Sequence, residues 1–203
     1  LPDSIKVVPE NIFGGCSSLS SITLGNGVTT LGNYCFNSTA ITTINLPNTL
    51  TEIGEGAFSS CYSLAEITIP SSVKKIGNNA FGATAIETIS FPSGLETLGS
   101  EDMFSGCKKL KSVTLPVATE IGDYYFSGCE ALEEVVIPDT VEIIGEKAFY
   151  NCEALKNINL PKNLKTIDKY AFMGCSALES IVIPEGVTTI DAAAFSGCRA
   201  LTT

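Results

Sequence analysis

The sequence predicts a repeat solenoid, a fold in which successive copies of one short unit stack along an axis. Two observations predict it. A phenylalanine recurs at intervals of 22 or 23 residues, at Phe13, Phe36, Phe58, Phe81, Phe104, Phe126, Phe149, Phe172 and Phe195. It belongs to the pattern A-F-x-x-C-x-x-L-x-x-I-x-L-P, which stands complete from Ala148 to Pro161. A fixed period of this length is typical of a solenoid, because a single copy cannot bury enough apolar surface alone and has to stack on its neighbours.

The repeats run through the whole chain. No composition shift or linker divides the 203 residues, so we expect a single domain of about eight to nine copies over residues 1–203. Leu1 and Pro2 match the end of a strand, Leu201 to Thr203 match the start of a ninth one, and neither end shows a polar capping copy. We therefore expect a piece of a longer array. No apolar run approaches the ~18 residues of a membrane-spanning helix, so no direct membrane insertion is expected.

The copy from residue 61 to residue 81 shows the elements expected in each repeat. Polar and apolar side chains alternate over residues 66–69, which predicts a strand with the isoleucines pointing inward. Pro70 ends that strand because proline has no N–H to donate. A second, weaker strand is expected over residues 73–76. The three-residue spacing from phenylalanine to cysteine then predicts a single helical turn with both side chains buried.

The slot before this turn holds glycine or aspartate, at Gly32, Gly54, Gly77, Gly99, Gly122, Gly145, Asp168 and Asp191. A positive φ angle would favour glycine and tolerate aspartate. A helix N-cap would favour both residue types as well. Pro9 occupies the same slot in the first copy, and the φ angle of proline is locked at a negative value. We therefore predict a helix N-cap at this slot.

A few copies depart from the pattern by one residue. Thr39 and Thr84 replace cysteine, and both copies are one residue short between phenylalanine and the next apolar side chain. One residue is added between Gly99 and Phe104, and one is missing in the segment 116–121. Because these changes lie in turns, we expect the strand register to stay intact.

Seven of the eight cysteines share one slot of the repeat, at Cys16, Cys61, Cys107, Cys129, Cys152, Cys175 and Cys198, and Cys35 takes an alanine slot. An even number of cysteines suggests disulfides. Stacked copies, however, carry these side chains in parallel, and threonine replaces cysteine twice. The pattern therefore favours buried, reduced thiols that act as small apolar side chains. A zinc site is disfavoured because a linear ladder does not supply tetrahedral ligands and the chain has no histidine.

Charge and composition exclude several function classes. The net charge of −10 argues against nucleic acid and anionic membranes as partners. Without histidine, no Ser-His-Asp or Cys-His arrangement is possible. Glu133 and Glu134 are consecutive strand residues and are expected to point to opposite faces, which argues against an acid–base pair. We therefore predict a non-enzymatic protein without a cofactor.

Acidic residues are concentrated in one stretch of the sequence, at Glu120, Asp123, Glu130, Glu133, Glu134, Asp139, Glu142, Glu146 and Glu153. A solvated surface is the favoured interpretation. A docking surface for a basic partner is the alternative.

The repeat also carries a family resemblance. With F-x-x-C ahead of L-x-x-I-x-(L/I)-P and x-x-V-x-x-I-G behind it, the pattern resembles the BspA-type, or Treponema pallidum-type, leucine-rich repeat over essentially the whole chain. The resemblance implies a right-handed, α/β-type leucine-rich repeat arc with a parallel sheet of about eight strands on its concave face. It also implies a cell-surface or secreted adhesin of a bacterium or protozoan parasite, which binds extracellular-matrix proteins such as fibronectin or fibrinogen.

The family has no fixed functional residues, so the candidate binding residues come from the strand pattern. Outward strand positions on the concave face are Glu66, Thr68, Thr88, Ser90, Ser112, Thr114, Glu134, Val136, Asn157, Asn159, Ser180 and Val182. Such residues also follow from β-propensity and cross-strand packing alone. Tyr34, Tyr124 and Tyr170, expected to be exposed near the turn, are weaker candidates because they are not on consecutive copies.

We expect a monomer that binds a protein ligand. A structural spacer without a ligand is the alternative. A carbohydrate-binding module is a third possibility, disfavoured because these positions lack aromatic stacking platforms.

Overall fold

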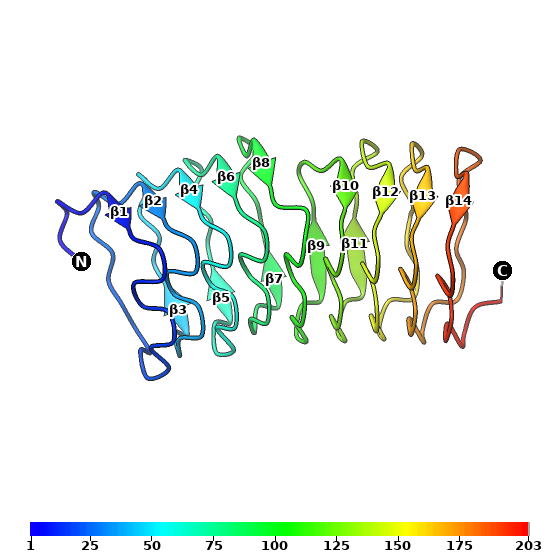
Figure 1. The fold of residues 1–203 in the computed structure, drawn as a ribbon, viewed down its shortest axis with the longest axis horizontal. Helices are drawn as coiled ribbons and strands as arrows, with labels where there is room; N and C mark the ends of the chain where they lie inside the picture. Colours follow the sequence, from blue (N-terminus) through cyan, green and yellow to red (C-terminus); the bar gives the residue numbers. More distant parts are fainter. Residues whose placement is uncertain (203) are drawn as a thin grey trace.

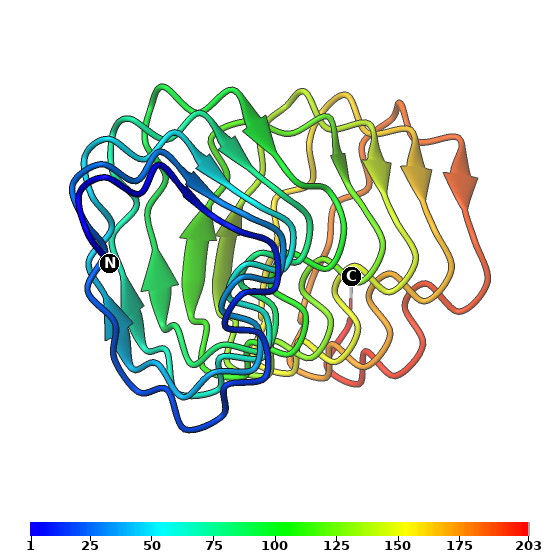
Figure 2. The same cartoon turned by 60° about the vertical axis from the view of Figure 1, so that its left-hand side comes forward.

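The computed structural model describes residues 1–202, which wind into a β-solenoid. Its copies stack side by side, and the two termini lie at opposite ends of the stack (Figure 1). The strands pair in parallel and form two rows on different sides of the core, seen together in Figure 2. The predicted solenoid of parallel strands is confirmed. The α/β-type arc with helical turns is wrong, because the described residues contain no helix. The strand expected to start at Leu201–Thr203 extends outside the described residues.

The first row of strands contains one strand from each copy. Its members are β1 (Val7–Val8), β2 (Thr30–Leu31), β4 (Glu52–Ile53), β6 (Lys75–Ile76), β8 (Thr97–Leu98), β10 (Glu120–Ile121), β12 (Ile143–Ile144), β13 (Thr166–Ile167) and β14 (Thr189–Ile190). In most of them the first residue is more exposed and the second is buried, as in β4. We expected these second strands to be the weaker ones. They are instead the more regular of the two rows.

The second row corresponds to the strand expected on the concave face. Its members are β3 (Thr43–Ile44), β5 (Glu66–Ile67), β7 (Thr88–Ile89), β9 (Ser112–Thr114) and β11 (Glu134–Val136). An isolated parallel bridge between Asn157 and Ser180 continues it. Among the described residues, this row therefore has five strands rather than the eight expected.

The hydrogen-bonded ladders are interrupted beside the one-residue irregularities. The first row breaks between β8 and β10, where one residue is added and one is missing. The second row breaks between β5 and β7, and β7 follows the short copy that contains Thr84. Within each unbroken part the register is regular, as in Thr88↔Ser112 and Ser112↔Glu134. The expectation that turns absorb these changes holds for register but not for the continuity of the ladder.

The segment around each phenylalanine is a run of turns instead of a helical turn. In the second copy, the N–H groups of Cys35 and Asn37 donate to carbonyls three residues earlier. The N–H groups of Tyr34 and Phe36 donate instead to Glu55 and Ala57 of the next copy. Because alternate N–H groups are used between copies, a run of i to i−4 bonds cannot form.

Neither explanation of the glycine slot is correct. There is no helix to cap, and the φ angles of these glycines are not positive. Positive φ occurs instead two residues before and two after the phenylalanine, as at Tyr34 (φ 55°) and Ser38 (φ 57°) around Phe36. The slot needs glycine because copies approach closely there. A Cβ atom on Gly77 would lie 2.5 Å from the backbone nitrogen of Glu55. No contact explains how aspartate fits this slot in the last two copies.

The core between the two rows is a stack of identical side chains. The nine phenylalanine rings stack from Phe13 to Phe195, with centroids of adjacent rings 5.0–6.1 Å apart. Beside them runs the cysteine ladder. The thiol of Cys129 donates to the carbonyl of Phe104 in the preceding copy at 3.1 Å, and five other thiols repeat this bond. Thr39 and Thr84 donate their hydroxyls to the phenylalanine carbonyls of their own copies.

Candidate protein-binding face

The solvent-facing side of the second row carries a continuous depression, which we call the trough. It consists of four hollows, each of which shares lining residues with the next, and their linings together extend from Thr43 to Ala177. Ile67 and Thr68 line two of them, Thr88 and its neighbours line the next pair, and Glu134 with Val136 line the last pair. The largest hollow has a volume of about 650 Å³ and lies toward the C-terminus. The trough crosses the strands and follows the axis of the stack.

The structure brings the twelve predicted site residues together on this one face. They form two columns, because the register aligns Thr88 with Ser112 and Ser112 with Glu134, and also Thr114 with Val136. The bridge from Asn157 to Ser180 extends the first column by two copies, and Asn159 and Val182 follow these residues by two positions in the sequence. Ser112 and Ser180 are half-buried, and the other ten residues are exposed.

The largest hollow combines charge with exposed apolar surface. Glu133, Glu134 and Lys156 line it, together with Asn157 and Val136. Val136 is 47% exposed, and Val182 in the same column is 82% exposed. The other hollows are lined by threonine, serine and asparagine together with a similar number of apolar residues, and Glu66 is the one further acid among the lining residues of the trough.

Sequence reasoning missed two features of this face. Phe91, the tenth phenylalanine, lines two adjacent hollows, although other copies have leucine or isoleucine in its slot. The phenylalanine in this slot was the sequence feature from which its special position could have been predicted. Glu133 and Glu134 are both exposed and line the same hollow, so the prediction of opposite faces is wrong. Glu133 lies just before β11, outside the alternating part of the strand.

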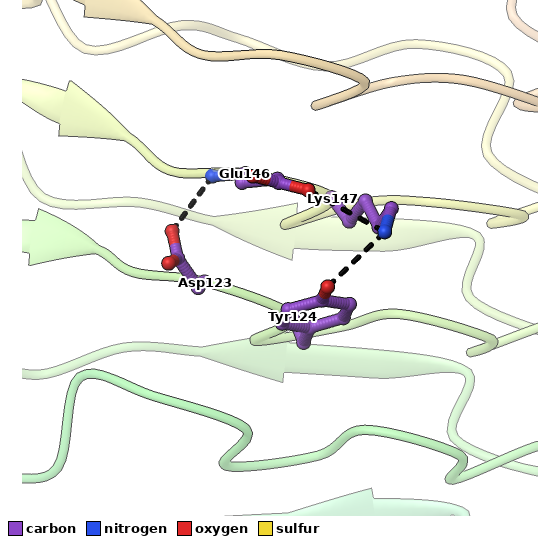
Figure 3. A network of polar contacts seen from close by, with 4 residues as sticks. All are labelled: Asp123, Tyr124, Glu146 and Lys147. Carbon is purple, nitrogen blue, oxygen red and sulfur yellow. Dashed lines mark hydrogen bonds and ion pairs between the residues drawn. The ribbon is translucent and has the colours of Figure 1, made fainter.

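The acidic stretch does not form a single docking surface. Glu120 lies on the first row, Glu134 lies on the second row, and Asp123 lies in the turn that follows β10. Several of these acids have local partners. Figure 3 shows Asp123 accepting a hydrogen bond from the backbone N–H of Glu146 at 2.8 Å. The hypothesis of one acidic band for a basic partner is therefore wrong, because consecutive slots of a repeat face different sides.

Two of the three tyrosines near the turn are linked through a lysine, and the third, Tyr34, donates its hydroxyl to Glu55. Tyr34, Tyr124 and Tyr170 share the positive-φ slot before the phenylalanine, and Lys147 occupies that slot in the copy between the last two. The ammonium of Lys147 donates to the hydroxyl of Tyr124 at 3.1 Å (Figure 3) and lies over the rings of Tyr124 and Tyr170. The hydrogen bond to Tyr124 raises the pKa of Lys147. These side chains are half-buried and partnered, so they are poorer candidates than the trough.

All eight cysteines are free thiols in the structure, and six of them are buried. Cys16 is exposed and Cys198 is half-buried, so the prediction of burial fails at the two ends of the ladder. Burial raises the pKa of Cys129 and Cys152 well above the ordinary value. Residues 1–202 contain no group of three acidic, cysteine or histidine side chains arranged to hold a metal ion. They also contain no helix that could cross a membrane.

Comparison with known proteins gives the family. A model described as "BspA type Leucine rich repeat region" matches residues 1–111 and 100–203 in six copies. The chain belongs to the BspA-type leucine-rich repeat family. Proteins of this kind are generally non-enzymatic protein-interaction modules, and no catalytic family is indicated.

Solved structures share the leucine-rich repeat fold. A leucine-rich repeat protein from Bacteroides ovatus is 26% identical, with a TM-score of 0.59, over 100% of this chain and 70% of that one. A leucine rich cell surface protein from Faecalibacterium prausnitzii is 26% identical, with a TM-score of 0.59, over 99% and 76%. The leucine-rich repeat protein of T. pallidum is 25% identical, with a TM-score of 0.51, over 100% and 76%. No curated protein matches the sequence.

Proposed function

We propose that this chain is a non-enzymatic protein-binding module of a cell-surface or secreted leucine-rich repeat protein, and that it attaches to its partner through the trough. The observation that carries the proposal is the overlap of four hollows into one depression over the second row. At ~4.8 Å per copy, the trough is on the order of 30 Å long.

The chemistry of the trough suits a protein partner better than a sugar. Its outward side chains are mostly small and polar, which supports hydrogen bonds to a peptide backbone. Phe91 is the one aromatic lining residue, and it is half-buried, so rings on which sugars stack are not available. The family resemblance suggests adhesion to extracellular-matrix proteins such as fibronectin or fibrinogen. The similar protein from F. prausnitzii is a cell surface protein, which supports a cell-surface or secreted location for this chain.

The test is binding of the purified chain to a panel of immobilised extracellular-matrix and bacterial-surface proteins. Thr114→Lys and Glu134→Lys change exposed side chains in the trough. Thr97→Lys and Glu142→Lys make the same changes at exposed positions on the side of the first row. We expect saturable binding that the two trough variants weaken and the two controls leave unchanged.

Two outcomes would contradict the proposal. If both trough variants bind a panel protein as tightly as the unsubstituted chain does, the binding site lies elsewhere on the chain. No binding to any panel protein, with the fold verified by circular dichroism, would favour a structural spacer.

A further inference from the structure

The two ends of the trough differ in chemistry. Toward the N-terminus, the hollows have volumes of about 220–410 Å³ and are lined by neutral polar and apolar residues, with Glu66 and the shared Glu134 as their acids. The largest hollow, which we call the C-terminal hollow, has a volume of about 650 Å³ and contains two glutamates and one lysine. The C-terminal hollow is therefore where a partner would find the most charged side chains and the largest volume.

The carboxylates of the C-terminal hollow are available to a partner. Elsewhere on the surface, acids pair with lysines of the adjacent copy, as in Lys111–Glu87 and Lys108–Glu130, both at 2.7 Å. Among residues 1–202, neither Glu133 nor Glu134 is within ion-pair distance of a basic group. Lys156 lines the same hollow. Lys111, whose pKa is raised mainly by Glu87 and to a smaller degree by Glu133, pairs with Glu87, so one negative charge is left in excess. The hollow is thus complementary to a single positive charge.

Apolar surface lies beside these carboxylates. Val136 is 47% exposed and follows Glu134 by two residues on β11, so both side chains point outward. Val182 continues the column of Val136, two copies further along, and is 82% exposed. Isolated exposed valines are ordinary on protein surfaces. Here they stand in one column, next to unpaired carboxylates and a hollow.

We infer that the C-terminal hollow binds an extended polypeptide segment that carries a basic side chain and an apolar side chain two residues apart. The inference rests on the proposed function and specifies the partner of the same site. Outward side chains two residues apart on a strand are separated by ~7 Å, and side chains i and i+2 of an extended peptide have the same separation. A segment that runs alongside β11, across the axis of the array, can therefore place a basic side chain at Glu134 and cover Val136 with the apolar side chain two residues away.

The experiment uses the 203-residue chain and fluorescent peptides of about ten residues, an extended length of about 33 Å. A glycine-serine peptide contains Arg-x-Leu at its centre. Two matched peptides contain Glu-x-Leu or Arg-x-Ser. We expect the Arg-x-Leu peptide to bind best by fluorescence anisotropy. We also expect its affinity to fall as salt rises, because exposed charge pairs are screened.

Variants of the chain locate the contact. Glu134→Gln should weaken binding of the Arg-x-Leu peptide by about 2- to 5-fold, as expected for an exposed ion pair, and should reduce its salt dependence. Val136→Ser should weaken binding of the Arg-x-Leu peptide and leave the affinity for the Arg-x-Ser peptide unchanged. Glu142→Gln and Ile143→Ser, at exposed positions on the other side of the same copy, are the controls and should change neither affinity.

The outcomes separate the inference from the proposed function. Equal binding of the Arg-x-Leu and Glu-x-Leu peptides, no effect of Glu134→Gln, or no saturable peptide binding would overturn the inference. If the chain still binds a panel protein and Thr114→Lys weakens that binding, the proposed function survives with a different partner chemistry. If no panel protein binds either, the proposed function itself fails.

Discussion

The ring of Phe91 packs against the ring of Phe104, with the ring centroids 6.4 Å apart and the planes inclined at 60°. Phe91 lines two hollows of the trough, whereas Phe104 is fully buried in the ring stack. The ring of Tyr125 also packs against Phe104, with a centroid distance of 6.0 Å. The trough is therefore supported directly by the core, at the copies where the repeat pattern is least regular.

Phe91→Ala should destabilise the chain by about 1–3 kcal/mol, less than the 3–5 kcal/mol typical of a fully buried phenylalanine, because this ring is half-buried. Urea unfolding followed by circular dichroism measures the change. Phe91→Leu restores the side chain that other copies carry and should cost less than Phe91→Ala. An equal loss in both variants would show that the contact with Phe104 is specific to the aromatic ring.

The position of a phenylalanine ring in the stack should determine how much it contributes to the free energy of unfolding. Phe126 is fully buried between two rings, so Phe126→Ala should lower the free energy of unfolding by about 3–5 kcal/mol. Phe195 is half-buried and stacks on one ring, so Phe195→Ala should cost clearly less. If residues 1–203 act as one domain, as we propose, both variants should unfold in a single transition. Two resolved transitions in the unsubstituted chain would argue against one domain.

Substitution of two glycines by alanine tests whether glycine is needed because copies pack closely or because of its conformational freedom. A Cβ atom on Gly77 would lie 2.5 Å from the backbone nitrogen of Glu55, so Gly77→Ala should force the two copies apart and lower the melting temperature. A Cβ atom on Gly94 would lie 3.1 Å from the ammonium nitrogen at the mobile end of Lys74. Gly94→Ala should therefore be nearly neutral. Equal melting temperatures for the two variants would disprove close approach as the reason for glycine.

Stability should fall at alkaline pH because of the thiol ladder. Burial raises the pKa of Cys35 to about 12 and that of Cys129 well above its usual value. The unfolded chain loses these thiol protons near pH ~8.5, whereas the folded chain keeps them to a higher pH. Unfolding then releases protons, so the free energy of unfolding falls as the pH rises above ~8.5, by at most about 1.4 kcal/mol per pH unit for each buried thiol.

Urea unfolding at a series of pH values measures this slope. Cys129→Ala removes one titrating thiol and should make the slope shallower, although it also lowers the stability at neutral pH. A slope unchanged by Cys129→Ala would contradict the contribution of this thiol.

The period of the phenylalanines was enough to predict the stack and the burial of its repeated side chains, except at the two ends of the stack. The alternation at Glu66–Ile69 likewise predicted the outward columns of the second row, because side-chain direction in a strand depends on sequence spacing alone. The form of the turn could not be predicted this way. A three-residue spacing from phenylalanine to cysteine fits a helical turn and the observed run of turns equally well, and hydrogen bonds to the next copy decide between them.

The trough itself lay beyond sequence reasoning. Its depth depends on how adjacent copies sit relative to one another. The position of Phe91 depends on contacts with Phe104, from the next copy. The register shows why Glu133 belongs to the same hollow as Glu134, since the strand begins at Glu134. The trough and the positions of Phe91 and Glu133 depend on the contacts between copies, which the pattern within one copy does not reveal.

The interruption between β8 and β10 has a mechanical consequence. When the two ends of the array are pulled apart along the axis, the load passes through the bonds between neighbouring copies. Most neighbouring copies share strand bonds in the first row, but β8 and β10 do not. The two copies are joined instead by the ladder between β7 and β9 in the second row, so at this junction strand pairing carries the load on one side of the core only.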